Sequence, residues 1–187
     1  MSTALVAAVR SGDITQVKDL LKDANADLSG EEGRTLLMLA AGTGNLLLVQ
    51  ALLAAGANVN AADEYGWTAL ACAVYNAELK RGFPDVVKAL IDAGADLEAA
   101  IGYGVRPLML AAGYGETEVV DALLAAGADV LARNEGGYTA LMMVKQKHYV
   151  DVINLLHEAE MLAGEGGCES RNAPDSNVIT FMKRPAA

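Results

Sequence analysis

Cysteine and aromatic residues are scarce in this sequence, and long hydrophobic runs are missing. The two cysteines, Cys72 and Cys168, are too few for a disulfide framework, so we expect a reducing, cytoplasmic compartment. Aromatic residues make up 5% of the chain, and the 53% hydrophobic content is mostly alanine and leucine, which favours thin, closely packed helices. No stretch reaches 18 apolar residues, and the apolar residues 4–9 are too few for a signal peptide, so neither a membrane-spanning helix nor a leader is predicted.

Basic residues are also in short supply. The chain has 14 Lys and Arg against 24 Asp and Glu, a formal net charge of −10. Residues 161–187 carry three residues of each sign, so the net charge lies entirely on residues 1–160. An acidic body repels phosphate backbones, which argues against nucleic acid as a partner.

The residues that carry chemistry do not gather into a recognisable pattern. His148 and His157 lie nine residues apart, with no Cys or His at metal-ligand spacing. The glycines are explained by a repeat and match no phosphate-binding loop. We therefore predict no catalytic residues, no metal site, no cofactor and no enzyme activity.

What the sequence does contain is a unit of about 33 residues that recurs in register. Gly33, Gly66, Gly104 and Gly137 each open a copy, at steps of 33, 38 and 33 residues. Each copy continues with a helical Ala/Leu pattern, a glycine, a helical Val/Leu pattern and a closing Gly-Ala-Asp or Gly-Ala-Asn in most copies. Such periodicity predicts a stacked array that presents an extended surface to another molecule.

The array is predicted to have five units with polar caps at both ends. In the last unit Lys145, His148 and His157 replace the small or apolar residues of the inner units, as expected where one face meets water. The predicted division is an N-terminal capping unit at 1–32, inner units at 33–65, 66–103 and 104–136, a C-terminal capping unit at 137–160, and a linker with a tail at 161–187.

This template resembles the ankyrin repeat. The resemblance rests on the turn threonines, the Ala-Ala pair of the first helix and the closing Gly-Ala-Asp/Asn motif. The matching residues are Thr35, Thr68, Thr139, Pro107, Ala40-Ala41, Ala111-Ala112, Gly56–Asn60, Gly94–Glu98 and Gly127–Leu131. The histidine of the family's turn is missing throughout, and Arg106 replaces one threonine, so weaker hydrogen bonds are expected in the turns. The resemblance implies an all-α solenoid of about five stacked helix-turn-helix units with projecting β-hairpin loops. It also implies that the loop tips and first helices line a concave binding surface for partners.

The aromatic residues point to that surface. Of the seven Tyr and Trp residues, six fall next to an opening glycine or nine to ten residues after one, at the loop tips or the exposed ends of first helices. These six are Tyr65, Trp67, Tyr75, Tyr103, Tyr114 and Tyr138. Each ring alone could pack on its neighbour, but together they favour a binding surface, because Tyr and Trp dominate interface energetics.

Charged residues accompany the aromatic tips. Arg34 follows the first opening glycine, and the acids on or next to the tips are Glu31, Glu32, Asp63, Glu64 and Glu135. Acids around an aromatic groove favour a protein or peptide partner with basic and apolar side chains, since Arg can also stack on aromatic rings. Glu64, Glu135 and Arg34 therefore join the six aromatic residues as predicted partner-binding residues. The alternative for the acids is a solvated loop face.

The third unit is five residues longer than its neighbours. We expect residues 77–81 to lengthen its first helix by about one turn and Pro84 to open the second helix. Lys80, Arg81 and Phe83 would then form a small basic and apolar projection, either a tolerated insertion or a second partner contact.

The tail carries a different pattern. Residues 178–185 combine β-branched and aromatic residues with two bases after a Gly-rich linker. They are either a featureless terminus or a segment that docks on a groove in the same or another chain. The sequence thus predicts a scaffold or adaptor. The alternatives are self-association or self-masking through the tail, and inhibition of a partner enzyme.

Overall fold

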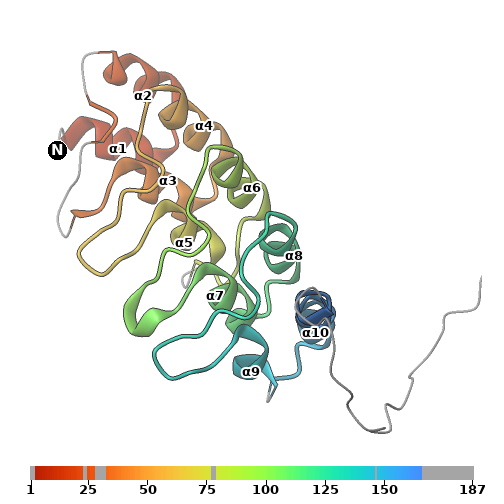
Figure 1. The fold of residues 1–187 in the computed structure, drawn as a ribbon. Helices are drawn as coiled ribbons and strands as arrows, with labels where there is room; N and C mark the ends of the chain where they lie inside the picture. Colours follow the sequence, from red (N-terminus) through yellow and green to blue (C-terminus); the bar gives the residue numbers. More distant parts are fainter. Residues whose placement is uncertain (1–2, 23–24, 28–32, 77–78, 146, 166–187) are drawn as a thin grey trace, which may run out of the picture.

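The computed structural model is a curved stack of helix pairs (Figure 1). It describes residues 3–22, 25–27, 33–76, 79–145 and 147–165. The first helices of the pairs are α1 (Thr3–Ser11), α3 (Leu36–Thr43), α5 (Ala69–Val74), α7 (Pro107–Tyr114) and α9 (Ala140–Val144). The second helices are α2 (Ile14–Leu21), α4 (Leu46–Ala54), α6 (Pro84–Asp92), α8 (Thr117–Ala125) and α10 (Val150–Glu165). The predicted all-α repeat solenoid is confirmed.

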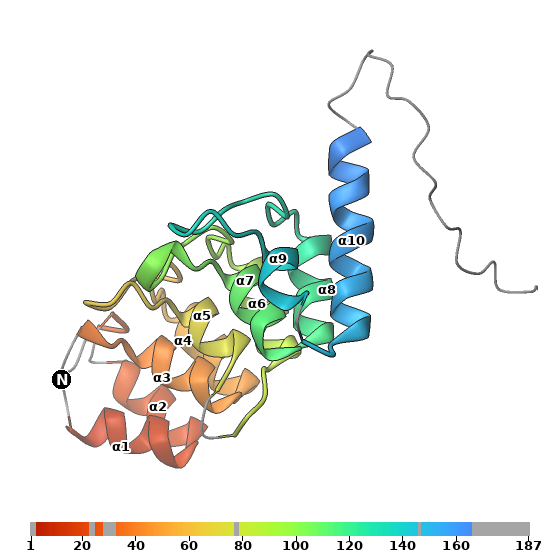
Figure 2. The ribbon, with the colours of Figure 1, turned by 90° about the horizontal axis from the view of Figure 1, so that it is seen from below.

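The two sets of helices form two layers. First helices pack on first helices and second helices on second helices, so that each layer runs the length of the stack (Figures 1 and 2). The loops between units project from the edge of the first-helix layer (Figure 1). Antiparallel bridges in these loops pair Ala62 with Thr68 and Ile101 with Val105, and the second of these loops includes the 3₁₀ turn η2 (Gly102–Gly104).

The repeated residues explain why each helix starts and stops where it does. The hydroxyls of Thr35, Thr68 and Thr139 accept the backbone N–H three residues ahead and so cap α3, α5 and α9. Gly44 and Gly115 follow α3 and α7 with φ of 73° and 80°, a left-handed conformation that glycine adopts without strain. The turn threonines thus keep their hydrogen bonds although the family's histidine is missing.

The core is continuous along the seam between the layers. The paired alanines of the first helices, such as Ala40 and Ala41, have no exposed surface, which lets neighbouring units approach closely. Leu52, Leu90 and Leu123 of the second helices fill the space between units and are also fully buried. Burial of each of these leucine side chains contributes about 2 kcal/mol relative to an exposed one.

A ladder of hydrogen bonds joins the loops that close successive units. In each step a side chain from one unit accepts a backbone N–H of the next. The steps link the Asn58 N–H to Asp27 Oδ1 (2.6 Å), the Asp96 N–H to Asn60 Oδ1 (2.8 Å) and the Asp129 N–H to Glu98 Oε1 (2.8 Å). The next position in register is Leu131, whose side chain can accept no hydrogen bond. In the last unit, α10 continues to Glu165 instead of stopping at a glycine. It therefore ends five residues beyond the predicted end of that unit at residue 160.

The insertion in the third unit differs from the prediction. Helix α5 ends at Val74, and Tyr75 is extended (φ −154°, ψ 129°), so the expected extra helical turn is wrong. The chain instead doubles back: the Asn76 N–H donates to the Arg81 carbonyl at 2.9 Å, and the Asn76 amide donates to the Gly42 carbonyl of the preceding unit. This tertiary contact fixes the departure from the helix. Pro84 opens α6, as predicted.

The predicted projection of Phe83 is also wrong. Phe83 is 7% exposed and packs against Gly44 at the end of α3. Tyr149, which precedes α10, lies in the same way against Gly115 at the end of α7. In both cases an aromatic residue before a second helix therefore packs on the glycine that ends the first helix of the preceding unit. Lys80 and Arg81 remain exposed, with the Arg81 guanidinium 5.2 Å from the centre of the Phe83 ring.

Candidate functional site

A cavity of about 660 Å³ opens on the first-helix layer, between the first and fourth units. Its wall comes from the end of α1, from α3 and α5, and from the end of α7. Three of the six predicted aromatic residues line it: Trp67, Tyr75 and Tyr114. Val9, Met38 and Leu39 supply the aliphatic part of the wall, and Arg10 and Arg34 supply its charge.

Tyr75 and Tyr114 form a parallel stack at one side of the cavity. Their ring centroids are 3.5 Å apart and the rings are inclined by 3°. Tyr114 is the last residue of α7, while Tyr75 meets it because the chain leaves the helical path after Val74. The stack fixes both rings, so they offer area to a ligand at little cost in side-chain entropy.

The other three predicted tyrosines do not reach the cavity. Tyr65, Tyr103 and Tyr138 lie on separate loop tips and are 60%, 82% and 56% exposed. The structure therefore divides the predicted aromatic surface into a cavity with three rings and a row of three exposed rings along the loops. Tyr149, which the template placed elsewhere, packs on Gly115 instead.

The loop that carries Tyr65 and Trp67 is organised by Asp63. Asp63 Oδ1 accepts the backbone N–H of Tyr65 at 3.0 Å and that of Trp67 at 2.8 Å. Asp63 Oδ2 lies 3.8 Å from Nε of Arg34. Because Asp63 is 7% exposed, it is a structural group, and its expected place among the acids offered to a partner is wrong.

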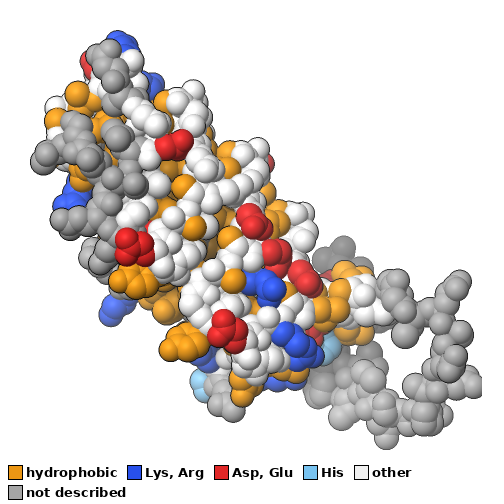
Figure 3. Space-filling view, turned by 60° about the vertical axis from the view of Figure 1, so that its left-hand side comes forward, with side chains coloured by type: hydrophobic (Ala, Val, Ile, Leu, Met, Phe, Trp, Pro, Cys, Tyr) orange, Lys and Arg blue, Asp and Glu red, His pale blue; other side chains and the backbone are white. Residues whose placement is uncertain are grey.

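The two edges of the surface differ in charge. Glu64 and Glu135 are exposed on the loop tips, as predicted, and Figure 3 shows acidic side chains beside hydrophobic ones along the loop side. Among the described residues that line the cavity, however, both charged side chains are cations, Arg10 and Arg34. Glu31 and Glu32 lie outside the described residues. The acids therefore border the surface at its tips and not at the cavity.

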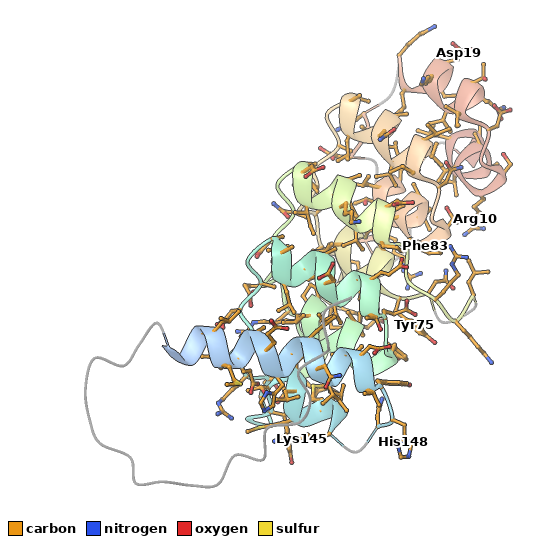
Figure 4. The ribbon with its side chains drawn as sticks, turned by 90° about the vertical axis from the view of Figure 1, so that its right-hand side faces the viewer. Arg10, Asp19, Tyr75, Phe83, Lys145 and His148 are labelled. Atoms are coloured by element: carbon orange, nitrogen blue, oxygen red, sulfur yellow. The ribbon has the colours of Figure 1, made fainter. Side chains whose placement is uncertain are left out.

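The opposite edge carries further basic groups. Figure 4 shows Arg10, Tyr75 and His148 along one edge of the stack, where the first helices end. Lys147 lies near the end of α9, and its ammonium group donates to the Gly113 carbonyl. Cations are favoured at helix C-termini by the helix dipole, which explains why Arg10 stands in the last turn of α1.

Cys72 is part of the cavity wall. Burial raises the pKa of its thiol to about 11, against a smaller lowering by the nearby Arg34. A thiol with that pKa is protonated at neutral pH and is a poor nucleophile. Within the described ranges, no group of three or more His, Cys, Asp or Glu residues could hold a metal ion.

Arg10 was missed by the sequence analysis. It lies two residues before Gly12, in register with Gly42 and Gly113, which stand two residues before the glycines that end α3 and α7. The first unit has no opening glycine, so a search that counts forward from opening glycines cannot place its residues. Counting backward from the closing glycine of each first helix would have found it.

Tyr103 has an unusual backbone for such an exposed residue. Its φ is 62°, in the left-handed region, where a non-glycine residue costs about 1 kcal/mol. We expect Tyr103→Gly to leave the free energy of unfolding unchanged or raise it by up to about 1 kcal/mol. Tyr65→Gly is the matched control, because Tyr65 is an exposed tip tyrosine outside the positive-φ region, and it should lose about 0.5–1 kcal/mol. Urea titration of both variants tests this, and equal losses would contradict it.

The geometry defines a class: helical-repeat proteins whose stacked units present an extended surface. A family model described as ankyrin repeats (3 copies) matches residues 5–101 and 77–165. The chain belongs to the ankyrin-repeat family, whose repeats mediate protein–protein interaction. No helix in the described part of the chain is both long and apolar enough to cross a membrane.

Curated relatives share parts of the sequence. The mouse RelA-associated inhibitor is 41% identical over 70 residues, which are 37% of this chain and 8% of the relative. The Notch-regulated ankyrin repeat-containing proteins of Xenopus tropicalis and Xenopus laevis are each 36% identical over 85 residues, 43% of this chain and 70% of the relative. The match thus spans a small part of the mouse relative and most of the Xenopus ones.

Proposed function

We propose that this protein is an adaptor that binds a partner protein or peptide on its first-helix face, without turnover. The observation that supports this most is the cavity, where Trp67 and the Tyr75–Tyr114 stack come together from two units. Large aromatic groups that converge in one hollow are typical of the centre of an interface. The exposed tyrosines of the loop tips, with Glu64 and Glu135, would extend the contact beyond the cavity. The net charge of −10 makes nucleic acid a poor partner.

The test is truncation of the central ring. Trp67→Ala should weaken partner binding by about 2 kcal/mol or more, because it removes the largest aromatic side chain at the cavity. Leu47→Ala is the matched control, since Leu47 is 61% exposed on α4 in the other layer. Binding of partners captured by the wild-type chain is measured by titration with each variant. Equal affinity of the wild-type and Trp67→Ala proteins would show that the partner binds elsewhere.

Inhibition of a partner is the second candidate. The name of one relative, RelA-associated inhibitor, supports this candidate. An adaptor and an inhibitor share the surface proposed above and differ in what the bound partner can still do. Activity of the captured partner with and without this chain separates them.

Self-association through the tail is the third candidate. Residues 178–185 lie outside the described residues, so the proposal rests on their basic and apolar sequence. Deleting residues 166–187 and comparing the solution mass and the fluorescence of Trp67 with those of the full chain tests it. Self-association predicts that the mass falls, and self-masking predicts that the exposure of Trp67 rises.

A further inference from the structure

We infer that the cavity receives an acidic side chain of the partner, flanked by an aromatic or large aliphatic one. This inference rests on the proposed function, and it names the chemistry of the segment that enters the cavity. It also reverses the sign of the charge that the sequence alone suggests for the partner.

The first step is the charge of the wall. Arg10 and Arg34 are the charged residues among the described lining of the cavity, and both side chains belong to exposed residues. Both arginines border the space that an anion in the cavity would occupy, whereas the acids Glu64 and Glu135 stand on the loop tips outside the lining. A cationic side chain would meet like charges there, and juxtaposed like charges exclude a partner.

The second step is the orientation of Arg34. Its Nε lies 3.8 Å from Oδ2 of Asp63, whose other oxygen is taken by two backbone N–H groups. A guanidinium has five N–H donors in a planar fork, more than a single carboxylate oxygen can engage, and the Arg34 side chain is still 55% exposed. Asp63 thus holds one side of the guanidinium and leaves exposed surface for the paired hydrogen bonds that a partner carboxylate would accept.

The third step is the apolar part of the wall. The Tyr75–Tyr114 stack, Trp67 and Leu39 border the same volume as the two arginines. An acidic group alone would leave these surfaces in contact with water, while an aromatic or large aliphatic neighbour would cover them. The pairing of a carboxylate with an apolar side chain matches the wall in both charge and polarity.

The experiment selects peptides from a random 12-residue display library on the full-length protein. Enriched peptides should contain Asp or Glu next to Phe, Tyr, Trp, Leu or Met. Synthetic peptides from the selection should bind the Arg10→Gln, Arg34→Gln double variant roughly tenfold more weakly, and the loss should shrink at high salt. The control is Lys18→Gln, Lys88→Gln, which removes two exposed cations from α2 and α6 in the other layer and should leave affinity unchanged.

The outcomes distinguish this inference from the proposed function. The inference would be overturned by peptides that lose affinity on Trp67→Ala but not on the double arginine change. It would also be overturned if the enriched peptides were basic. Either result would leave the cavity as the binding site. Peptides insensitive to Trp67→Ala, or no enriched peptide at all, would overturn both. Enrichment of acidic and apolar peptides that lose affinity on both changes supports both.

Discussion

Gly44→Ala should destabilise the protein by about 2–4 kcal/mol, one of the largest effects of any single methyl group in the chain. Gly44 has φ of 73°, and a Cβ there would overlap the ring of Phe83, which is itself 7% exposed. The left-handed backbone costs about 1–2 kcal/mol for alanine, and moving a buried ring from its packed position adds a similar amount. Urea titration should show a lower midpoint with an unchanged slope.

Gly56→Ala is the matched control for this prediction. Gly56 follows the end of α4 with φ of 84°, but a Cβ there meets no atom within 4 Å. The two substitutions share the backbone strain and the loss of chain entropy in the unfolded state, so their difference isolates the contact with Phe83. Gly56→Ala should cost about 1 kcal/mol. In a Phe83→Leu background the cost of Gly44→Ala should fall toward that of Gly56→Ala, and equal costs in both backgrounds would contradict the clash.

The contact between Gly44 and Phe83 also shows where sequence reasoning stops. That Gly44 ends a helix is predictable, because each opening glycine sets a register in which the same local rule holds at every copy. That its missing side chain makes room for Phe83 is not predictable, because Phe83 lies in the next unit and meets Gly44 only through the stacking of the two units. The rules that end a helix repeat with the period of the sequence, whereas contacts between units depend on how the units stack in three dimensions.

The insertion illustrates the same limit. Residues 77–81 have no proline, so a continued helix is the reasonable prediction from propensity. The structure instead turns back after Tyr75, because Asn76 bonds the Gly42 carbonyl of the preceding unit and pairs with Arg81. A tertiary hydrogen bond outweighs a difference in helix propensity that is only about 0.7 kcal/mol per residue or less.

The aromatic residues of the candidate site were predictable from the sequence, but the arrangement of their rings in space was not. The template correctly placed Tyr65, Tyr103 and Tyr138 at loop tips, since tip positions follow directly from the opening glycines. The template could not show that these three tyrosines lie apart from the rings that line the cavity. The stack of Tyr75 on Tyr114 needs the extended backbone of Tyr75, which follows from the insertion.

Asp63→Ala should lower the free energy of unfolding by about 3 kcal/mol and weaken partner binding as well. The substitution removes the acceptor for the backbone N–H groups of Tyr65 and Trp67, and each unsatisfied group costs about 1–3 kcal/mol where water does not replace the bond. Loss of the carboxylate also releases Arg34 from its contact at 3.8 Å. Because Trp67 is the sole tryptophan, a red shift of its fluorescence in the folded protein reports directly on loosening of this loop.

The chain supplies its own control for this change. Asn134 occupies the same place in the last loop, three residues before an opening glycine, and its Oδ1 accepts the backbone N–H of Tyr138 at 3.0 Å. An amide oxygen can therefore do what the Asp63 carboxylate does, so Asp63→Asn should cost under about 1 kcal/mol and leave Trp67 emission unchanged. If the role of Asp63 were instead to neutralise Arg34, Asn and Ala would be equally damaging, since both remove the charge. A thermal or urea melt of the two variants side by side decides between the hydrogen bonds and the ion pair as the cause.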